Sequence, residues 1–308
     1  MKICVIGAGQ VGATVAQRII EKGLGDAVLL DIAEGLAEGK SLDMIQSAYI
    51  EGFTSKIIGI NDFKKITGSQ IVIVTAGFTR KQGMSRTDLL LKNVEIIKSI
   101  SVQIREYAPN SLLLMVTNPL DIMAYVALKI TGFNPAKVIG MAGLLDSARY
   151  CAFIAQEAGV AIKDVQALVL GGHGDSMVPL PEYTVINGIP VSNFLSKESL
   201  DKIIEHTRNG GAEIISLLKT GSAYYSPSSC VVDMVKAIVY DEKRVITASV
   251  YLKGEYGYHD IYLGVPIILG KNGMEKIVSI PLSLKAKTDL DKSAKIVKDV
   301  IKEIEGKI

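Results

Sequence analysis

Residues 2–23, KICVIGAGQVGATVAQRIIEKG, contain the main evidence for the fold of this chain. A short apolar run leads directly into the glycine pattern GAGQVG, residues 7–12, which opens a stretch with apolar residues at helical spacing. The pattern G-x-G-x-x-G alone is weak evidence, because the chain contains 29 glycines. Here it lies between a strand and a helix, and Asp31 ends the next apolar run about twenty residues on, which is typical of a dinucleotide-binding unit.

Each glycine of this pattern has a steric reason. Gly7 permits the tight turn, Gly9 lets a pyrophosphate approach the backbone, and Gly12 lets helix and strand pack closely. The first N–H groups of the helix and its dipole then favour phosphate. Asp31 indicates the dinucleotide, because a carboxylate accepts hydrogen bonds from the ribose hydroxyls of NAD and repels the 2′-phosphate of NADP. The sequence therefore predicts NAD as the cofactor.

Short β-rich runs alternate with amphipathic stretches of helix length through the first half of the chain. This order predicts a Rossmann-type doubly wound parallel sheet of about six strands over residues 1–142. From residue 143 the rhythm changes: a helix is expected over 144–159, and an Asn187-Gly188 dipeptide between apolar runs signals a tight hairpin. We therefore predict a second α+β domain over residues 143–308, with antiparallel ribbons, packed closely on the first.

Composition places the chain among ordinary globular proteins. Its 308 residues suffice for two domains, and 48% hydrophobic with 21% charged residues argues against disorder. A net charge of +2, without charge blocks outside the lysine-rich C-terminal stretch, does not indicate nucleic acid as a partner. The apolar runs are shorter than the ~18 residues of a membrane helix, and a strand begins at once without a signal peptide. We expect a cytoplasmic protein with no membrane partner.

The cysteines indicate neither a disulfide framework nor a metal site. Cys4, Cys151 and Cys230 are odd in number, widely spaced and set in apolar contexts, so we expect reduced core residues. No Cys/His cluster with ligand spacing is visible in the sequence, and we predict no metal.

A histidine stands in the segment GGHGDS, residues 171–176, behind an apolar run. A lone histidine is more often structural than catalytic, which is how we interpret His206 and His259. His173 differs because the surrounding glycines leave room for its ring to face a small cavity. Its ordinary pKa near ~6.5 suits proton transfer at neutral pH.

A histidine base needs a carboxylate that orients the ring and stabilises the imidazolium. The expected helix that begins LLDSAR offers Asp146, and Arg149 lies on the same helical face three residues on. An ordinary helical ion pair is the alternative interpretation of these two residues. Their place at the junction of the two predicted domains favours a ligand site.

Two arginines, Arg80 and Arg86, lie in the glycine-punctuated loop of VTAGFTRKQGMSR, residues 74–86. An arginine in a surface loop is often only solvated. A flexible cationic loop over the end of a strand is, however, a common way to capture an anion. The sequence thus predicts an anionic ligand here if the rest of the chain supplies a site.

Six segments, GAGQVG, LLDI, VTAGFTRKQGMSR, VTNPLD, GLLDSAR and GGHGDSMVP, occur in the order and approximate spacing of the lactate and malate dehydrogenase family. The resemblance covers essentially the whole chain and is greatest to malate-type members of the branch closest to lactate dehydrogenases. It implies an oxidoreductase of the tricarboxylic acid cycle that transfers hydride between NAD and a 2-hydroxy acid. Malate and oxaloacetate are the expected substrate pair, and a homo-oligomer, tetramer or dimer, is the expected assembly.

The resemblance assigns roles to the candidate catalytic residues. It implies that His173 is the general acid and base and that Asp146 is its carboxylate partner. Arg149 would hold the substrate's C1 carboxylate through a two-pronged hydrogen bond, a geometry that guanidinium offers and ammonium does not. Arg86 would polarise the C2 carbonyl.

The resemblance also assigns substrate discrimination and the remaining cofactor contacts. Arg80 would read the group on C3, because an arginine fits the second carboxylate of oxaloacetate where lactate dehydrogenases carry an uncharged residue. Asn118 would position the reacting oxygen and hold the nicotinamide side of the site. The cofactor contacts implied besides Gly7, Gly9, Gly12, Asp31 and Asn118 are Gln10, Val11, Thr75, Ala76, Gly77, Asn93 and Val116.

Three other functions stay open at this point. A lactate or broad 2-hydroxy-acid dehydrogenase would accept pyruvate despite Arg80. An NAD-dependent glycosidase would share the nucleotide-binding half but would need a metal site. A silent nucleotide-binding module would have no reason to keep Asp146, Arg149 and His173 together with Arg86.

Overall fold

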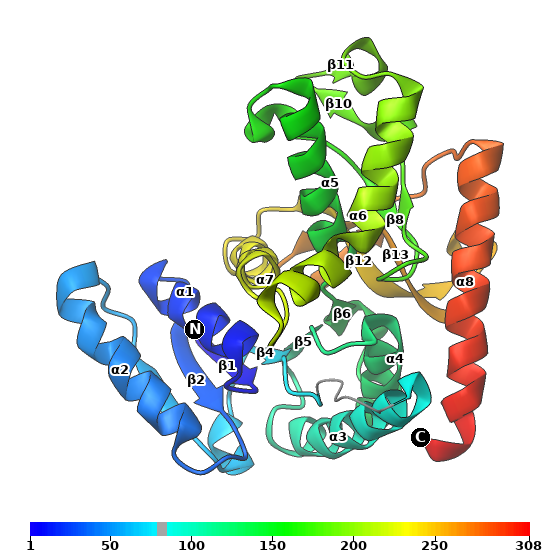
Figure 1. The fold of residues 1–308 in the computed structure, drawn as a ribbon. Coiled ribbons are helices and arrows are strands. Elements are labelled where there is room, and N and C mark those ends of the chain that lie inside the picture. Colours follow the sequence, from blue (N-terminus) through cyan, green and yellow to red (C-terminus); the bar gives the residue numbers. More distant parts are fainter. Residues whose placement is uncertain (79–84) are drawn as a thin grey trace.

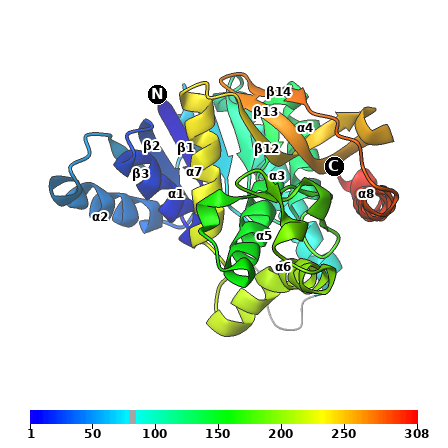
Figure 2. The same ribbon diagram turned by 90° about the horizontal axis from the view of Figure 1, so that it is seen from above.

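A nine-stranded sheet runs through the molecule in the order β14-β13-β12-β6-β5-β4-β1-β2-β3. The structure is a computed structural model and describes residues 1–78 and 85–308, apart from the side chain of Arg86. Figures 1 and 2 show the sheet in the middle of the molecule with helices packed around it.

The first six strands are parallel and lie in the order 3-2-1-4-5-6, which is typical of doubly wound dinucleotide-binding sheets. In β1, four successive residues, Ile3 to Ile6, are buried. Such continuous apolar runs arise because helices cover both faces of a parallel sheet. The six-strand prediction is confirmed. The strands are β1 (Lys2–Ile6), β2 (Asp26–Leu30), β3 (Ile57–Ile60), β4 (Ile71–Val74), β5 (Leu112–Met115) and β6 (Val138–Gly140).

Four helices connect these strands: α1 (Gln10–Glu21), α2 (Leu36–Glu51), α3 (Arg86–Tyr107) and α4 (Leu120–Thr131). The helical pattern of DLLLKNVEIIKSISVQI predicts a helix from about Asp88 to Tyr107, and α3 begins two residues earlier, at Arg86. The reason is a capping box, in which the Ser85 side chain accepts from the Asp88 N–H and the Asp88 carboxylate accepts from the Ser85 N–H. These bonds satisfy donors at the helix start that would otherwise have no partner.

The second half carries the remaining elements. The helices are α5 (Gly143–Ala158), α6 (Lys197–Leu218), α7 (Tyr225–Val239) and α8 (Leu284–Ile304). The strands are β7 (Val165–Gln166), β8 (Val169–Leu170), β9 (Val178–Pro179), β10 (Val185–Ile186), β11 (Ile189–Pro190), β12 (Arg244–Lys253), β13 (His259–Gly270) and β14 (Gly273–Ile277). Short 3-10 helices span Phe63–Ile66, Pro135–Lys137, Ile162–Asp164, Pro181–Tyr183, Val191–Asn193, Glu255–Gly257 and Glu305–Lys307.

The predicted hairpin at Asn187-Gly188 is confirmed. Strands β10 and β11 pair across these two residues, whose φ angles of 48° and 84° are both positive, as a type I′ turn requires. The apolar run before His173 forms two short strands, β7 and β8. The division arises because β7 pairs with β10 and β8 pairs with β9, in two separate small sheets.

The two halves share one sheet. Strand β12 runs antiparallel to β6, with Ser249 opposite Gly140, and β13 and β14 extend the sheet further as antiparallel strands. A Cβ on Gly140 would lie 2.9 Å from the Ser249 Cβ, so the glycine permits this close approach. Helix α8 contacts β13 and α4, and Figure 1 shows it reaching from the second half to the first. The expected antiparallel ribbons and close packing of the halves are therefore confirmed.

Two of the three cysteines are core residues, as expected. Burial raises the pKa of the Cys4 and Cys230 thiols to about 12. Cys151 differs from the expectation, because it lies on α5 and is only half-buried. All three are free. Among the described residues, no helix is long and apolar enough to span a bilayer.

Candidate active site

The glycine loop lies between β1 and α1, where β1 is flanked by β2 on one side and β4 on the other. Gly7 has a φ of 104°, and a Cβ there would lie 2.6 Å from the Ala76 nitrogen. A Cβ on Gly12 would lie 1.8 Å from the Gly7 carbonyl oxygen. Gly9 faces open space and caps α1 without a side-chain hydrogen bond. The first N–H groups of α1 are therefore open to an anion, which fits the pyrophosphate of a dinucleotide.

Asp31 follows β2 and is held beside the glycine loop by hydrogen bonds. Its two carboxylate oxygens accept from the backbone N–H groups of Ala8, at 2.7 Å, and Ala33, at 2.9 Å. Lys40, on α2, donates from Nζ to the Ala8 carbonyl at 2.7 Å. The carboxylate and the loop are thus held together before any ribose binds. Lys40 could not be singled out before the structure was known, because in the sequence it resembles any other helix lysine.

The segment after β4 lies beside the glycine loop. The Thr75 hydroxyl donates to the Gly7 carbonyl at 3.1 Å, which connects the residue after β4 to the residue after β1. A Cβ on Gly77 would lie 2.5 Å from Thr117 Cγ2. Dinucleotides bind at this point of a doubly wound sheet, where the strand order reverses. The structure thus brings the predicted cofactor residues Thr75, Ala76 and Gly77 next to the glycine loop, and Gln10 and Val11 begin α1 there.

Asn93 connects two other predicted cofactor-binding segments. Its buried side chain accepts from the Phe78 N–H at 2.6 Å and donates to the Asn118 carbonyl at 2.8 Å. It therefore ties the segment after β4 to the segment after β5, which contains Val116 and Asn118. Asn118 itself is exposed.

His173 and Asp146 form the predicted pair. The distance from His173 Nδ1 to Asp146 Oδ2 is 2.9 Å, and the two side chains are 14% and 3% exposed. Burial acts to lower the pKa of His173, but the charge and hydrogen bond of Asp146, together with the charge of Asp121, outweigh it and raise the pKa above its ordinary value. The geometry is that of an acid–base histidine with an orienting carboxylate.

Arg149 lies one turn along α5 from Asp146. Its Nη1 is 3.7 Å from Asp146 Oδ1, which is too long for a hydrogen bond. Arg149 Nε and Asp146 Oδ1 are both buried without a hydrogen-bond partner among the described residues. Because buried polar groups are normally bonded, the arrangement fits a ligand carboxylate better than an ordinary ion pair. Gly211 of α6 also faces this guanidinium, since a Cβ there would lie 3.7 Å from Nη1, and the sequence did not indicate this approach.

Asp121 is a second carboxylate beside His173, and sequence reasoning missed its role. Its Oδ2 accepts from the backbone N–H of His173 at 2.8 Å, and its Oδ1 accepts from the Ser249 hydroxyl at 2.6 Å. One signal was available: Asp121 is the only charged residue in LDIMAYVAL, the apolar stretch that begins α4.

The structure describes neither of the two loop arginines in full. Arg80 lies outside the described residues, as does the side chain of Arg86, whose backbone begins α3.

A cavity of about 600 Å³ borders His173 and Asp121 and is walled by α3, α4 and α8. Among the described residues, no group of three or more His, Cys, Asp and Glu could hold a metal ion.

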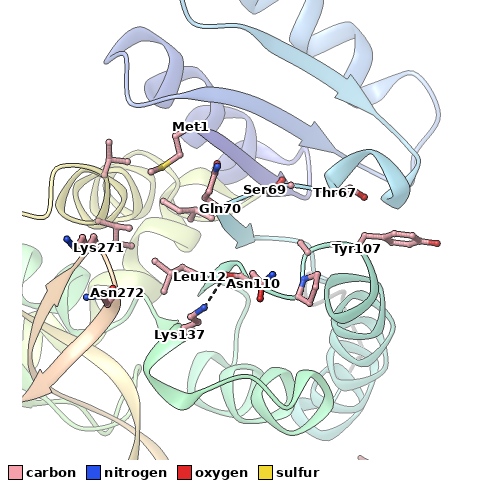
Figure 3. Close-up of a pocket in the computed structure, with 16 residues that line it drawn as sticks. Met1, Thr67, Ser69, Gln70, Tyr107, Asn110, Leu112, Lys137, Lys271 and Asn272 are labelled. Atoms are coloured by element: carbon pink, nitrogen blue, oxygen red, sulfur yellow. Dashed lines mark hydrogen bonds between the residues drawn. The ribbon is translucent and has the colours of Figure 1, made fainter.

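Figure 3 shows another cavity, of about 720 Å³, which contains none of the predicted site residues. It lies where β4, β5 and β6 begin, whereas the glycine loop and Asn118 follow the ends of their strands. Lys137 on its wall donates to the Asn110 carbonyl at 3.2 Å. Its position therefore separates it from the candidate active site.

Comparison with known proteins gives matches over nearly the whole chain. Residues 1–140 match the lactate/malate dehydrogenase NAD binding domain, and residues 144–308 match the lactate/malate dehydrogenase alpha/beta C-terminal domain. The chain belongs to the lactate/malate dehydrogenase family. This confirms the resemblance carried by the six segments and the prediction of NAD as cofactor.

Several members of the lactate/malate dehydrogenase family are closely similar. Malate dehydrogenase of Roseiflexus sp. (strain RS-1) is 52% identical over 97% of both chains, and that of Methanosarcina barkeri is 49% identical over 99% of both. The solved malate dehydrogenase of Picrophilus torridus has a TM-score of 0.97 at 44% identity, covering 99% of this chain and 97% of its own. Lactate dehydrogenase of Cryptosporidium parvum, complexed with lactic acid and nicotinamide adenine dinucleotide, has a TM-score of 0.96 at 41% identity, covering 99% and 98%.

Proposed function

We propose that this protein is an NAD-dependent malate dehydrogenase that interconverts (S)-malate and oxaloacetate. The observation that carries the proposal is the group of His173, Asp146 and Arg149, in which Arg149 Nε is buried and has no hydrogen-bond partner among the described residues. A proton-transfer group and a guanidinium that can receive a carboxylate therefore both lie next to Asp146. The relatives named malate dehydrogenase, 52% and 49% identical over nearly the full chain, support the choice of substrate.

The histidine moves the proton of the reaction. Because Asp146 is an acceptor, Nδ1 of His173 carries the hydrogen of that bond, which leaves Nε2 to take the hydroxyl proton of malate or return it to oxaloacetate. Asp146 stabilises the imidazolium that results. Bound NAD supplies the hydride acceptor. Arg149 holds the C1 carboxylate with two parallel hydrogen bonds, so that C2 is fixed relative to His173.

The loop arginines complete the substrate site in this proposal. Arg86 polarises the C2 carbonyl, and loss of one such donor typically costs ~10²–10³ in turnover. Arg80 pairs with the second carboxylate of oxaloacetate. Asn118 positions the reacting oxygen, while Gly7, Gly9, Gly12, Asp31 and the other cofactor contacts predicted from the sequence hold NAD.

A parallel assay with oxaloacetate and pyruvate tests this substrate assignment. We expect purified protein to oxidise NADH with oxaloacetate at a kcat/KM about 100-fold or more above that with pyruvate, because Arg80 would face pyruvate without an anion. The nicotinamide absorbance follows both reactions. The likeness to the Cryptosporidium parvum lactate dehydrogenase favours lactate dehydrogenase as the second candidate. Equal or better use of pyruvate would establish that candidate.

The raised pKa of His173 predicts a pH dependence. The imidazole is protonated below its folded pKa, which lies above its ordinary value of 6.5, and neutral above it. Reduction of oxaloacetate needs the protonated form, so its kcat/KM should fall as pH rises through that pKa, while kcat/KM for malate rises. Measuring both between pH 5 and 10 tests this. Asp146→Asn should move the midpoint down, and a wild-type midpoint below 6.5 would contradict the assignment.

We further propose an oligomeric state, a cellular location and a role for each domain. Helix α2 exposes Leu42, Ile45, Tyr49 and Ile50, and the end of α6 exposes Ile215, Leu217 and Leu218. Exposed apolar residues gathered on helix faces favour association with a second copy, so we propose a homo-oligomer, either tetramer or dimer.

The protein would act in the cytoplasm, in the tricarboxylic acid cycle. Residues 1–142 would bind NAD and residues 143–308 would form the substrate-binding domain.

A further inference from the structure

Asp121 is a buried carboxylate in the first turn of α4 that the proposed chemistry does not use. The residue is 5% exposed, and its neighbours from Leu120 to Leu128 are all buried. Burying a charge is costly unless it is hydrogen-bonded, and here each carboxylate oxygen has a donor: the His173 N–H and the Ser249 hydroxyl. The N-terminal end of the helix further favours a negative charge at this position.

The loop that carries His173 is held by side chains on both sides. Next to the His173 N–H, the Gly172 N–H donates to Ser293 Oγ of α8 at 2.8 Å, and Ser293 Oγ lies 3.0 Å from Ser176 Oγ. A Cβ on Gly172 would lie 3.0 Å from Val297 Cγ2 and 3.4 Å from Asp121 Oδ2. The glycine therefore lets the loop approach both helices, and two backbone donors outside any strand find side-chain acceptors there.

The partners of Asp121 belong to the other half of the molecule. Asp121 lies on α4, three residues after Asn118, and thus in the half that binds NAD. Ser249 lies on β12, where it pairs with Gly140 of β6 in the other half of the sheet, and His173 lies in the loop after β8. Asp146 orients the ring of His173 but comes from the second half as well. The contact through Asp121 thus joins the backbone of His173 directly to the half that is proposed to bind the cofactor.

We propose that Asp121 is a positioning residue, which through its hydrogen bonds to the His173 backbone and to Ser249 fixes the catalytic histidine relative to the cofactor-binding half. This inference rests on the proposed function. A shift of the imidazole by about 1 Å suffices to lower turnover ~10²-fold, because proton and hydride transfer need close geometry.

Asp121 also acts on His173 through its charge. Burial raises the pKa of the Asp121 carboxyl, and its two hydrogen bonds counteract part of that effect. Among the groups around the imidazole, Asp146 and Asp121 raise the pKa of His173 and Arg149 lowers it, and Asp175 and Glu303 line the cavity beside the ring. Asp121 therefore acts on His173 in two ways, through its hydrogen bonds and through its charge. Asp121→Asn removes the charge and can keep the hydrogen bonds.

Three variants test the role. Asp121→Asn keeps an oxygen for the His173 N–H and an amide that can donate to Ser249, so its kcat should stay within about threefold of wild type. Asp121→Ala removes both bonds and should lower kcat by about 10²-fold with KM for NADH unchanged. Ser249→Ala removes one bond and should lower kcat by roughly 3- to 10-fold, within the range of one hydrogen bond. Asp299→Ala, on the exposed side of α8, is the matched control and should behave as wild type.

An NMR titration of the His173 imidazole gives a second readout that needs no substrate. Its pKa should fall in Asp121→Asn and stay unchanged in Asp299→Ala. Wild-type kcat in Asp121→Ala would overturn the inference, as would a loss of kcat in Asp121→Asn as large as in Asp121→Ala. Should Asp121→Ala fail to fold, wild-type kcat in Ser249→Ala together with an unshifted imidazole in Asp121→Asn would overturn it. Wild-type protein that does not reduce oxaloacetate would instead refute the proposed function, and the titration would still report on Asp121.

Discussion

Replacing His173 with asparagine is expected to lower kcat for oxaloacetate reduction by about 10²–10⁴-fold, while NADH binds nearly as well as in wild type. Asparagine keeps a polar side chain of smaller size but cannot carry the proton at neutral pH. The glycine loop and Asp31, which are proposed to bind the dinucleotide, lie in the other half of the molecule and keep their contacts. Steady-state turnover and an NADH fluorescence titration on the same preparation measure the two effects separately.

His206 provides the matched control for this substitution. Its ring stacks on Phe153 with the centroids 3.9 Å apart, and it pairs with Glu213 on the surface of α6. His206→Asn should therefore leave turnover nearly unchanged. Turnover near wild type in His173→Asn would remove this histidine from the mechanism, whatever its distance to Asp146.

Replacing Arg80 with glutamine is expected to shift the kcat/KM ratio from oxaloacetate toward pyruvate by at least tenfold. In the proposed site, an unpaired buried arginine opposes pyruvate by roughly 2–5 kcal/mol, or about one and a half to three and a half decades of discrimination. Glutamine removes that charge and also the partner of the second carboxylate. Parallel assays with the two 2-oxo acids measure the shift.

Lys81 offers the control for Arg80, because it carries a positive charge at the next position of the same loop. Lys81→Gln should leave the ratio unchanged if the effect depends on recognition and not on the charge of the loop as a whole. An unchanged ratio in Arg80→Gln would mean that this arginine does not contact the substrate.

The parts of the fold that depend on neighbouring residues could be predicted from the sequence. Gly7 and Gly12 are required by contacts within one strand–turn–helix unit, and Asn187-Gly188 by the twist of one hairpin, so short patterns contain the information. The start of α3 was misplaced by two residues because the reciprocal bonds of Ser85 and Asp88 outweigh the apolar periodicity that suggested Asp88.

The parts that depend on distant residues could not be predicted in the same way. Pairing of Ser249 with Gly140 joins strands 109 positions apart, and no local pattern gives that register. Lys40 and Asp121 likewise acquire their contacts only when separate segments meet. The pair of His173 and Asp146 was predicted because the chemistry requires a carboxylate and the resemblance indicates which one.

Asp146 and Arg149 occupy one turn of α5. The residues proposed for catalysis are thus on a different segment from the residue proposed for substrate specificity. A helix turn is rigid, so the spacing between the carboxylate that pairs with His173 and the guanidinium proposed to hold the C1 carboxylate of every 2-oxo acid is built into one element. The residue expected to read the variable end, Arg80, stands on a different segment of the chain. In the proposed site, substitutions there would change which acid is accepted without disturbing proton transfer, so divergence of specificity within this scaffold would need few steps and would not begin with a loss of catalysis.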